Sequence, residues 1–188
     1  SDLRQLMQTL VSFKEDLCRE DFNAIPFINA DGYHSKTIAY SIWHIFRIED
    51  IVAHTVITED EQVFFTGNYQ VRINSPIITT GNELVKQQIA DFSKQLNLEE
   101  LYSYIFEVRE STEKILERFS YDELKWKIPD ERKGYLKSLN VVNCDEKAIW
   151  LIDYWCSKDI RGLIQMPFSR HWIMHTEACL RIKNKMHS

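Results

Sequence analysis

Residues 38–57 read IAYSIWHIFRIEDIVAHTVI, and this stretch decides the fold class. Its apolar residues recur at spacings of three and four, which is the period of an α-helix rather than of a strand. Projection onto a helix puts His44 on the apolar face and His54 on the opposite face, beside Arg47 and Asp50. We therefore predict an amphipathic helix with His44 toward the core and with Asp50 and His54 toward solvent. The other members of the apolar face are Ser41, Ile45, Ile48, Ile51, Val52 and Thr55.

A second helical stretch covers residues 167–186, PFSRHWIMHTEACLRIKNKM. Pro167 suits the first turn of a helix, because the amide that proline lacks has no helical partner there. His171 and His175 are four residues apart, so both imidazoles stand on one face. That face also carries apolar residues, so we expect both histidines to point into the core. The apolar members of the face are Phe168, Ala178, Cys179 and Ile182.

Helical periodicity recurs along most of the chain, which holds only five glycines and four prolines. Asn97 and Asp145 are candidate N-caps, because their side chains can accept hydrogen bonds from a first helical turn. Residues 58–81 are too apolar for a free linker, so we expect an ordered connector. Trp150 and Trp155 lie in an apolar run and are expected in the core. The predictions amount to one all-α domain over residues 1–188, with further helices at residues 2–19, 82–96, 98–119 and from Asp145 to before Gly162.

The composition excludes several classes of protein. The chain has a formal net charge of −5, the wrong sign for a protein that depends on phosphate contacts with nucleic acid. Four cysteines without a CxxC pair indicate reduced thiols and a cytoplasmic protein. No apolar run approaches the ~20 residues of a membrane span, so we expect no membrane association. One basic stretch is interpreted as a solvated loop, with an anion-binding patch as the alternative: Lys125, Lys127, Arg132, Lys133 and Lys137.

Three inward-facing histidines are a candidate metal site. Neutral imidazoles suit zinc, nickel, copper or iron(II), and three protein ligands leave a position for water or substrate. The alternative is that His44, His171 and His175 only fill the core. Cys179, one turn after His175, is either a fourth ligand or a small core residue. Glu49 borders the apolar face and is a candidate base or orienting group.

Two segments carry a resemblance to a known family. Residues 41–50, SIWHIFRIED, are similar to the second-helix ligand segment of the DinB-like (DinB/YfiT) metalloenzymes, and residues 171–175, HWIMH, are similar to their final-helix histidine pair. The resemblance implies a four-helix bundle of DinB/YfiT type, here with extra short helices and long connectors. It also implies a divalent ion, zinc, nickel or iron, held by His44, His171 and His175. Many relatives continue with further His, Arg and Gly residues around the last ligand, and this chain departs from that continuation.

The resemblance further implies an enzyme of the thiol S-transferase type. A low-molecular-weight thiol would attack a small electrophilic substrate held under the 58–81 connector. The alternatives are a metal-dependent hydrolase and a non-enzymatic, stress-related bundle that the ion braces. Relatives also look commonly dimeric, and four apolar residues outside the predicted core faces are available for a homodimer or for burial under the extra helices: Phe46, Ile57, Ile173 and Leu180.

Overall fold

The computed structural model describes residues 2–187, and these fold into helices joined by turns. They form no β-strand, and the one isolated bridge among them joins Lys127 to Asp159. The prediction of an all-α protein is confirmed. Over the same residues, none of the helices combines the length and the apolar character needed to cross a membrane.

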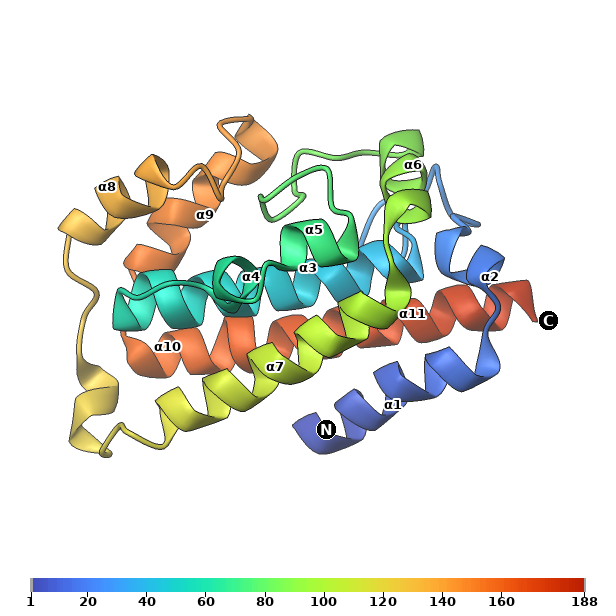
Figure 1. Cartoon of the computed structure of the whole chain (residues 1–188). Helices are drawn as coiled ribbons and strands as arrows, with labels where there is room; N and C mark the ends of the chain where they lie inside the picture. The colour runs from blue at the N-terminus through green and yellow to red at the C-terminus, as the bar shows by residue number, and fades with distance from the viewer. Residues whose placement is uncertain (1, 188) are drawn as a thin grey trace.

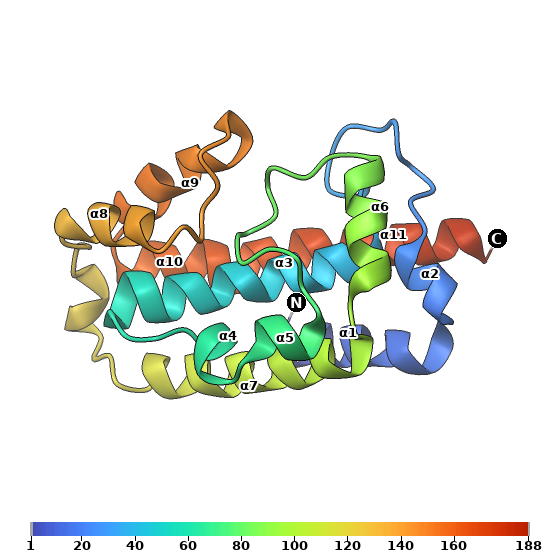
Figure 2. The ribbon, with the colours of Figure 1, turned by 45° about the horizontal axis from the view of Figure 1, so that its top comes forward.

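Four long helical segments lie side by side and form the body of the molecule (Figure 1). The helix α3 runs alongside α11 through the middle, while α7 packs against α3 and α1 packs against α11 (Figure 2). The two histidine-bearing stretches are therefore direct neighbours. The segments are α1 (Leu3–Asp16), α3 (Ile38–Asp50) with its π-helical continuation η1 (Ile51–Thr58), α7 (Leu98–Leu116), and α10 (Ile160–Gln165) with the π-helical η3 (Met166–Arg170) and α11 (His171–Met186).

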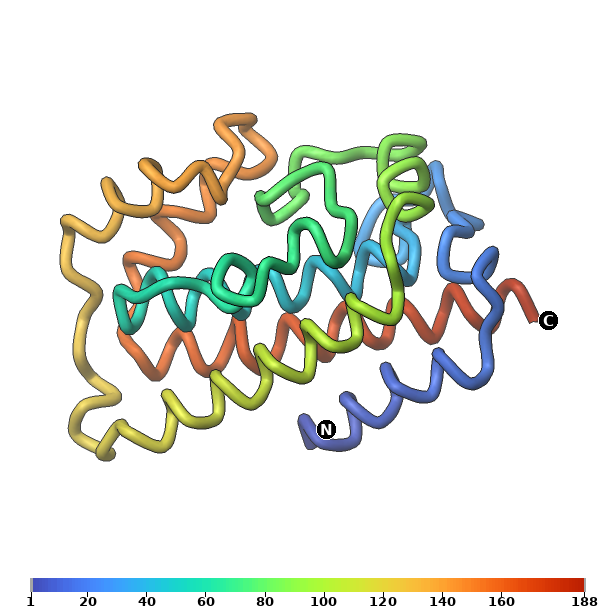
Figure 3. Tube along the Cα trace, viewed as in Figure 1, coloured from blue at the N-terminus to red at the C-terminus, as the bar shows by residue number. Residues whose placement is uncertain are grey.

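Shorter helices fill the connections, as the chain trace in Figure 3 shows. Of these, α2 and α6 pack on each other and on α3, α4 and α5 pack on α7, and α8 and α9 pack on η1. The long connectors are thus ordered layers around the four main segments. Their bounds are α2 (Arg19–Asn23), α4 (Val63–Thr66), α5 (Tyr69–Ile73), α6 (Gln87–Gln95), η2 (Asp122–Lys125), α8 (Glu131–Ser138) and α9 (Glu146–Cys156).

Helix starts follow the capping side chains. The side chains of Asn97 and Asp145 accept hydrogen bonds from first-turn amides of α7 and α9, at 3.1 and 2.8 Å, as predicted. Thr37 caps α3 in the same way. The helix predicted from residue 82 begins later, at Gln87, because the chain first makes a turn in which Gly81 has a φ of 79°.

Buried apolar residues form two clusters, one centred on α1, α3 and α7 and the other on η1, α9 and α10. Trp155 belongs to the second cluster, as predicted. The same prediction is wrong for Trp150, which is 49% exposed. Five residues along a helix correspond to about 140° of rotation, so one face of α9 cannot bury both tryptophans.

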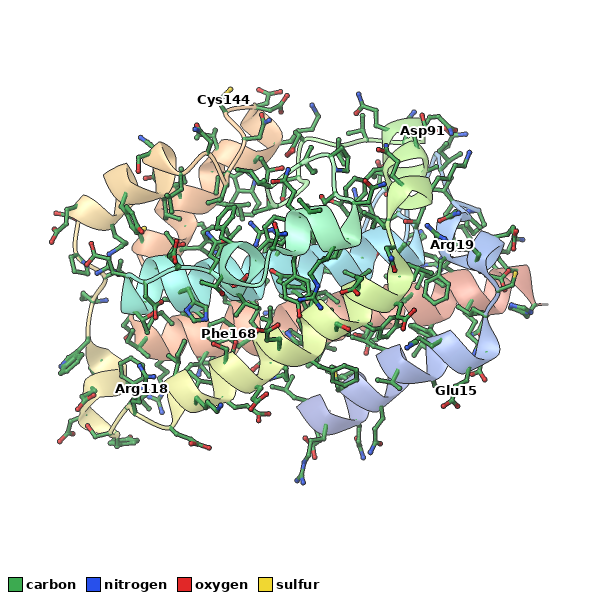
Figure 4. The ribbon with its side chains drawn as sticks, in the orientation of Figure 1. Glu15, Arg19, Asp91, Arg118, Cys144 and Phe168 are labelled. Carbon is green, nitrogen blue, oxygen red and sulfur yellow. The ribbon has the colours of Figure 1, made fainter. Side chains whose placement is uncertain are left out.

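The interior and the periphery of the bundle are visible in Figure 4, where Phe168 lies among the long helices and Cys144 stands at the outer turn before α9. Phe168 is 1% exposed, whereas the Cys144 thiol is free and exposed. Phe46 is also fully buried, with its ring 4.7 Å from that of Trp172. Phe46 is therefore a core residue and has no surface to offer a second chain, whereas Leu180 remains 38% exposed.

The polar face of α3 and η1 is buried, so the prediction that it faces solvent is wrong. Arg47 and Asp50 are fully buried, and His54 is only 8% exposed. The reason is that α11, α7 and the start of the 58–81 connector surround this segment together. Polar side chains on a helix that is covered all round must find their partners inside the protein.

Asp50 fastens the connector to α3. Its carboxylate accepts hydrogen bonds from the amides of Val63 and Phe64, at 2.9 and 2.8 Å, which are the first two residues of α4. The hydroxyl of Tyr104, on α7, donates a third bond at 2.7 Å. Burial raises the pKa of Asp50, while the Arg47 guanidinium 3.5 Å away favours the charged carboxylate. One side chain thus joins α3, α4 and α7.

Arg47 holds both ends of the same connector. One guanidinium nitrogen donates to the side chain of Gln62 at 2.9 Å, close to the connector's start. The other donates to the carbonyl of Ile78 at 2.6 Å, close to its end. The guanidinium also lies 4.0 Å from the centroid of the Phe64 ring. The connector is therefore attached to α3 at two separated points.

His54 has a partner for each ring nitrogen. Nδ1 lies 2.7 Å from a carboxylate oxygen of Asp60, and Nε2 lies 2.7 Å from the hydroxyl of Ser111. The order serine, histidine, aspartate resembles a hydrolytic triad. However, Ser111 lies inside α7, whose backbone amides are engaged in helical hydrogen bonds and supply no oxyanion hole. We interpret the contact as a clamp that ties the end of η1 to α7.

The prediction that the basic stretch is a solvated loop is wrong for Arg132. It is 7% exposed, and its guanidinium donates to the carbonyls of Val56 and Ile57 and pairs with Glu59 at 3.5 Å. The last carbonyls of a helix lack intrahelical donors, and Arg132 supplies one to η1. The expectation of a solvated basic residue holds for Lys125, Lys127 and Lys137, which are exposed.

Replacing Asp50 with alanine is expected to lower the free energy of unfolding by about 3–5 kcal/mol, because Arg47 would remain buried without its carboxylate. Urea unfolding followed by circular dichroism measures this change. The matched control Asp122→Ala, at an exposed position of η2, should change it by less than about 0.5 kcal/mol. A similar effect of both substitutions would contradict the role given to Asp50.

Candidate metal centre

Three histidines from neighbouring helices meet inside the bundle. His44 comes from α3, and His171 and His175 come from the first turns of α11. One ligand atom from each lies within 4.8 Å of the others, and the ring centroids are 4.5–5.0 Å apart. All three side chains are buried, so the prediction that they share the core side is confirmed.

The chain enters α11 through the π-helical turn η3. Pro167 lies at the start of this turn, and proline cannot donate a helical hydrogen bond. The hydroxyl of Ser169 donates to the carbonyl of Ile164 at 2.9 Å and so satisfies one of the backbone groups that the wide turn leaves free. π-helical turns inside helices are frequent at functional sites. Here the turn directly precedes His171.

The carbonyl of Thr80 sets the orientation of His44. It lies 2.6 Å from Nδ1, and a carbonyl can only accept, so Nδ1 carries the proton. Nε2 is then left with a free lone pair. The Thr80 amide donates to the carbonyl of Val141 at 3.1 Å, which fixes the peptide chain at this point. Histidines that bind metals are commonly oriented by such a bond from the other ring nitrogen.

Gly81 lets the chain approach His44 closely. The ring of Tyr40 stacks on His44 with centroids 5.4 Å apart, and its hydroxyl donates to the Gly81 carbonyl at 2.8 Å. A Cβ at residue 81 would lie 2.8 Å from a ring carbon of Trp43, and the φ of 79° also disfavours any other residue. The position therefore requires glycine.

The other two imidazoles lack hydrogen-bond partners. His171 Nδ1 and both ring nitrogens of His175 are buried and have no partner among the described residues. A buried polar group without a partner costs about 1–3 kcal/mol. Burial also lowers the pKa of all three histidines, that of His44 to about 4, so each is neutral near pH 7. Neutral imidazoles with free nitrogens fit a divalent metal ion.

A cavity of about 270 Å³ opens beside the three histidines. Its walls come from the segment before α3, from α9 and from η3. Tyr33 lies edge-on to His175, with centroids 4.8 Å apart, and Trp150 and Tyr154 form an aromatic pair on α9. The expectation that residues 58–81 cover the substrate is wrong, because this connector packs on α3 and α7 and lines no part of the cavity.

Glu49 and Cys179 lie outside this cavity. The Glu49 carboxylate is fully buried and accepts hydrogen bonds from Arg109 at 2.9 Å, Thr112 at 3.1 Å and Trp172 at 3.0 Å. Burial raises the pKa of Glu49 to about 7, against the opposing effect of Arg109. Because Trp172 follows His171, this carboxylate orients α11, and it does not line the cavity.

Cys179 is a core residue. Its side chain is fully buried one turn past His175, and burial raises the pKa of the thiol to about 12. It does not belong to the cluster of ligand atoms that the three histidines form among residues 2–187. Of the two open interpretations of this cysteine, the structure supports the small core residue.

Several residues of the site were missed at the level of the sequence. Tyr40 precedes His44 by four residues, so helical spacing could have found it, whereas Lys36 lies before the start of α3, where helical spacing does not apply. Trp150 was assigned to the core rather than to the cavity. The Thr80 carbonyl carries no signal in the sequence, because any residue has a carbonyl and only the path of the connector brings this one to His44.

Comparisons with known proteins find a similar fold and indicate no activity. No family model matches the chain, and a search of curated proteins finds no relative. The chain is similar to a solved structure of a conserved protein from Enterococcus faecalis, with a TM-score of 0.64 and 11% identity over 97% of this chain and 91% of the other. At this identity the likeness concerns the arrangement of the helices alone.

The buried histidines make the stability of the metal-free protein depend on pH. An unfolded histidine has a pKa near 6.5, and burial lowers it in the folded state, so the unfolded state binds more protons below about pH 6.5. The contribution of the histidines to the free energy of unfolding should be fully present above pH 6.5 and should fall as the pH decreases toward 4, by about 1.4 kcal/mol per pH unit for each histidine, while Glu49, whose pKa is raised, opposes this fall.

Urea unfolding of the chelator-treated protein between pH 4.5 and 7 measures this slope. His175→Gln should flatten the slope, whereas His187→Gln, at an exposed position near the end of α11, should leave it unchanged. Equal slopes in the wild type and His175→Gln would contradict the neutral, buried state of His175.

Proposed function

We propose that the protein binds a divalent metal ion through His44, His171 and His175 and acts as an enzyme on a small molecule. One observation carries the proposal: three neutral imidazoles face one another beside a cavity, and two of them have buried nitrogens without any partner. Zinc, nickel and iron(II) suit such a nitrogen set. The resemblance of residues 41–50 and 171–175 to the DinB-like family supports the same ligands.

Thiol transfer is the reaction that we assign to the site. A bound divalent ion lowers the pKa of a coordinated thiol from its usual value of about 8.5. The residues that line the cavity include no aspartate or glutamate, so the cavity offers no carboxylate as a general base. A thiol with a lowered pKa loses its proton to water without such a base. Hydrolysis by an activated water remains the second candidate, because the same three ligands suit it.

The surrounding residues bind and orient the reactants. Thr80 keeps the Nε2 lone pair of His44 free. Burial raises the pKa of Tyr40, so its phenol stays protonated and donates to the Gly81 carbonyl, which holds the ring that stacks on His44. Trp150 and Tyr154 offer an apolar wall to an electrophile. In the transfer a carbon–sulfur bond forms, the bond to the leaving group breaks with its electron pair, and the thiol proton passes to solvent.

The non-enzymatic alternative is a structural metal site, in which the ion only holds the helices of the bundle together. Structural metal sites usually have four protein ligands, whereas catalytic sites keep one position open. Here Cys179 lies outside the three-histidine cluster, and the three histidines border the cavity. The arrangement favours an open site over a closed one.

Protein purified without added metal or an affinity tag should contain about one equivalent of a divalent metal per chain, the occupancy expected of one such site. Elemental analysis measures the content. His171→Ala should abolish it, because two imidazoles remain, while the exposed control His187→Ala should retain it. A metal content that is the same in both variants would refute the assignment of the ligands.

Metal-loaded protein should accelerate the conjugation of 2-mercaptoethanol to members of a panel of alkyl halides and epoxides, with the thioether measured by chromatography. His171→Ala should lower the rate by at least about tenfold, because the thiol would lose its site. In a second arm of the experiment, the metal-loaded protein is incubated with esters and amides in the absence of any thiol. Turnover in this arm alone would exclude thiol transfer and support hydrolysis.

A further inference from the structure

Lys36 places a positive charge in the wall of the cavity. It lies just before Thr37, the residue that caps α3, and its side chain is partly buried. With the histidines neutral, it is the one fully charged side chain among the lining residues. Its ammonium lies 5.8 Å from the centroid of the Tyr40 ring, and it forms no ion pair with a carboxylate of residues 2–187.

The charge lies close to the candidate metal centre. Tyr40 and His44 are four residues apart within α3 and lie on the same side of this helix, whereas Lys36 lies in the segment before α3 and lines the cavity from there. Tyr40 contacts both neighbours, with Lys36 5.8 Å and His44 5.4 Å from its ring centroid. The ammonium and the imidazole therefore lie at the two ends of a short path along one wall of the cavity.

The amino end of α3 adds to the positive electrostatic potential that Lys36 produces in the cavity. The amino end of a helix carries a partial positive charge, and α3, with 13 residues, begins directly after Lys36 and Thr37. The Lys36 side chain is partly buried, and the loss of hydration lowers the pKa of its ammonium group. A partly desolvated cation without a carboxylate partner is stabilised when an anion enters the cavity.

We propose that the cavity selects a thiol that also carries a carboxylate, with the carboxylate bound by Lys36 and the sulfur directed toward the three histidines. The inference rests on the proposed thiol-binding metal site and adds the class of the thiol. Lys36 is then the residue that determines specificity, and the aromatic wall of Trp150 and Tyr154 remains free for the electrophile.

Cobalt(II) allows the test without catalysis, because a thiolate bound to this ion gives a charge-transfer absorption band. Cobalt-loaded protein is titrated with mercaptocarboxylates of increasing chain length and with the mercaptoalcohols of matched length. The wild type should bind the best mercaptocarboxylate about tenfold more tightly than its alcohol, as expected for one charge-assisted contact. Added salt should reduce this preference.

Lys36→Met should abolish the preference and leave cobalt binding and the affinity for mercaptoalcohols unchanged. Lys36→Arg should retain most of the preference, and the control Lys94→Met, at an exposed position of α6, should retain all of it. Equal affinities for both series in the wild type, or a preference that persists in Lys36→Met, would overturn this inference alone. A failure of the wild type to bind cobalt, or the lack of a thiolate band with either series, would overturn the proposed function as well.

Discussion

The buried pair of Arg47 and Asp50 is the constraint on which the rest of the site depends. Two charges inside a protein are costly to desolvate unless further donors and acceptors surround them. Here the partners are backbone groups and side chains of the connector and of α7. The pair therefore holds the long connector, residues 58–81, in a fixed position against α3. Arg47 binds the carbonyl of Ile78, which lies only two residues before Thr80. The same contact therefore helps to position the Thr80 carbonyl that orients His44.

The orientation of α11 depends on a second buried carboxylate. One carboxylate oxygen of Glu49, Oε1, accepts hydrogen bonds from both Trp172 on α11 and Arg109 on α7, which fixes how α11 is rotated relative to α3 and α7. Because Trp172 directly follows His171, that rotation also decides where the imidazole points. Glu49 and Asp50 are adjacent in sequence, and their carboxylates bind different elements. One aligns the connector beside His44, and the other aligns the helix that carries the remaining two histidines.

Helical periodicity predicted the parts of this arrangement that depend on one helix at a time. The inward direction of His44, His171 and His175 followed from the period of 3.6 residues, and the capping residues marked where several helices begin. The burial of Asp50 and His54 did not follow, because a helical wheel separates polar from apolar residues but does not show how many neighbours surround the helix. Side chains that look like a solvated face become the internal polar contacts of a central helix when other elements cover them.

The unpartnered nitrogens of His171 and His175 connect the stability of the fold with the proposed metal site. Each buried polar group without a partner costs about 1–3 kcal/mol, while a whole domain is stable by only about 5–15 kcal/mol. Without metal, these unpartnered nitrogens therefore lower the free energy of unfolding by a substantial part of its total. A smaller core would not tolerate this cost, and here two large apolar clusters flank the site and offset it. A bound ion would engage one nitrogen of each imidazole and remove part of this penalty, so the free energy of metal binding would include that part.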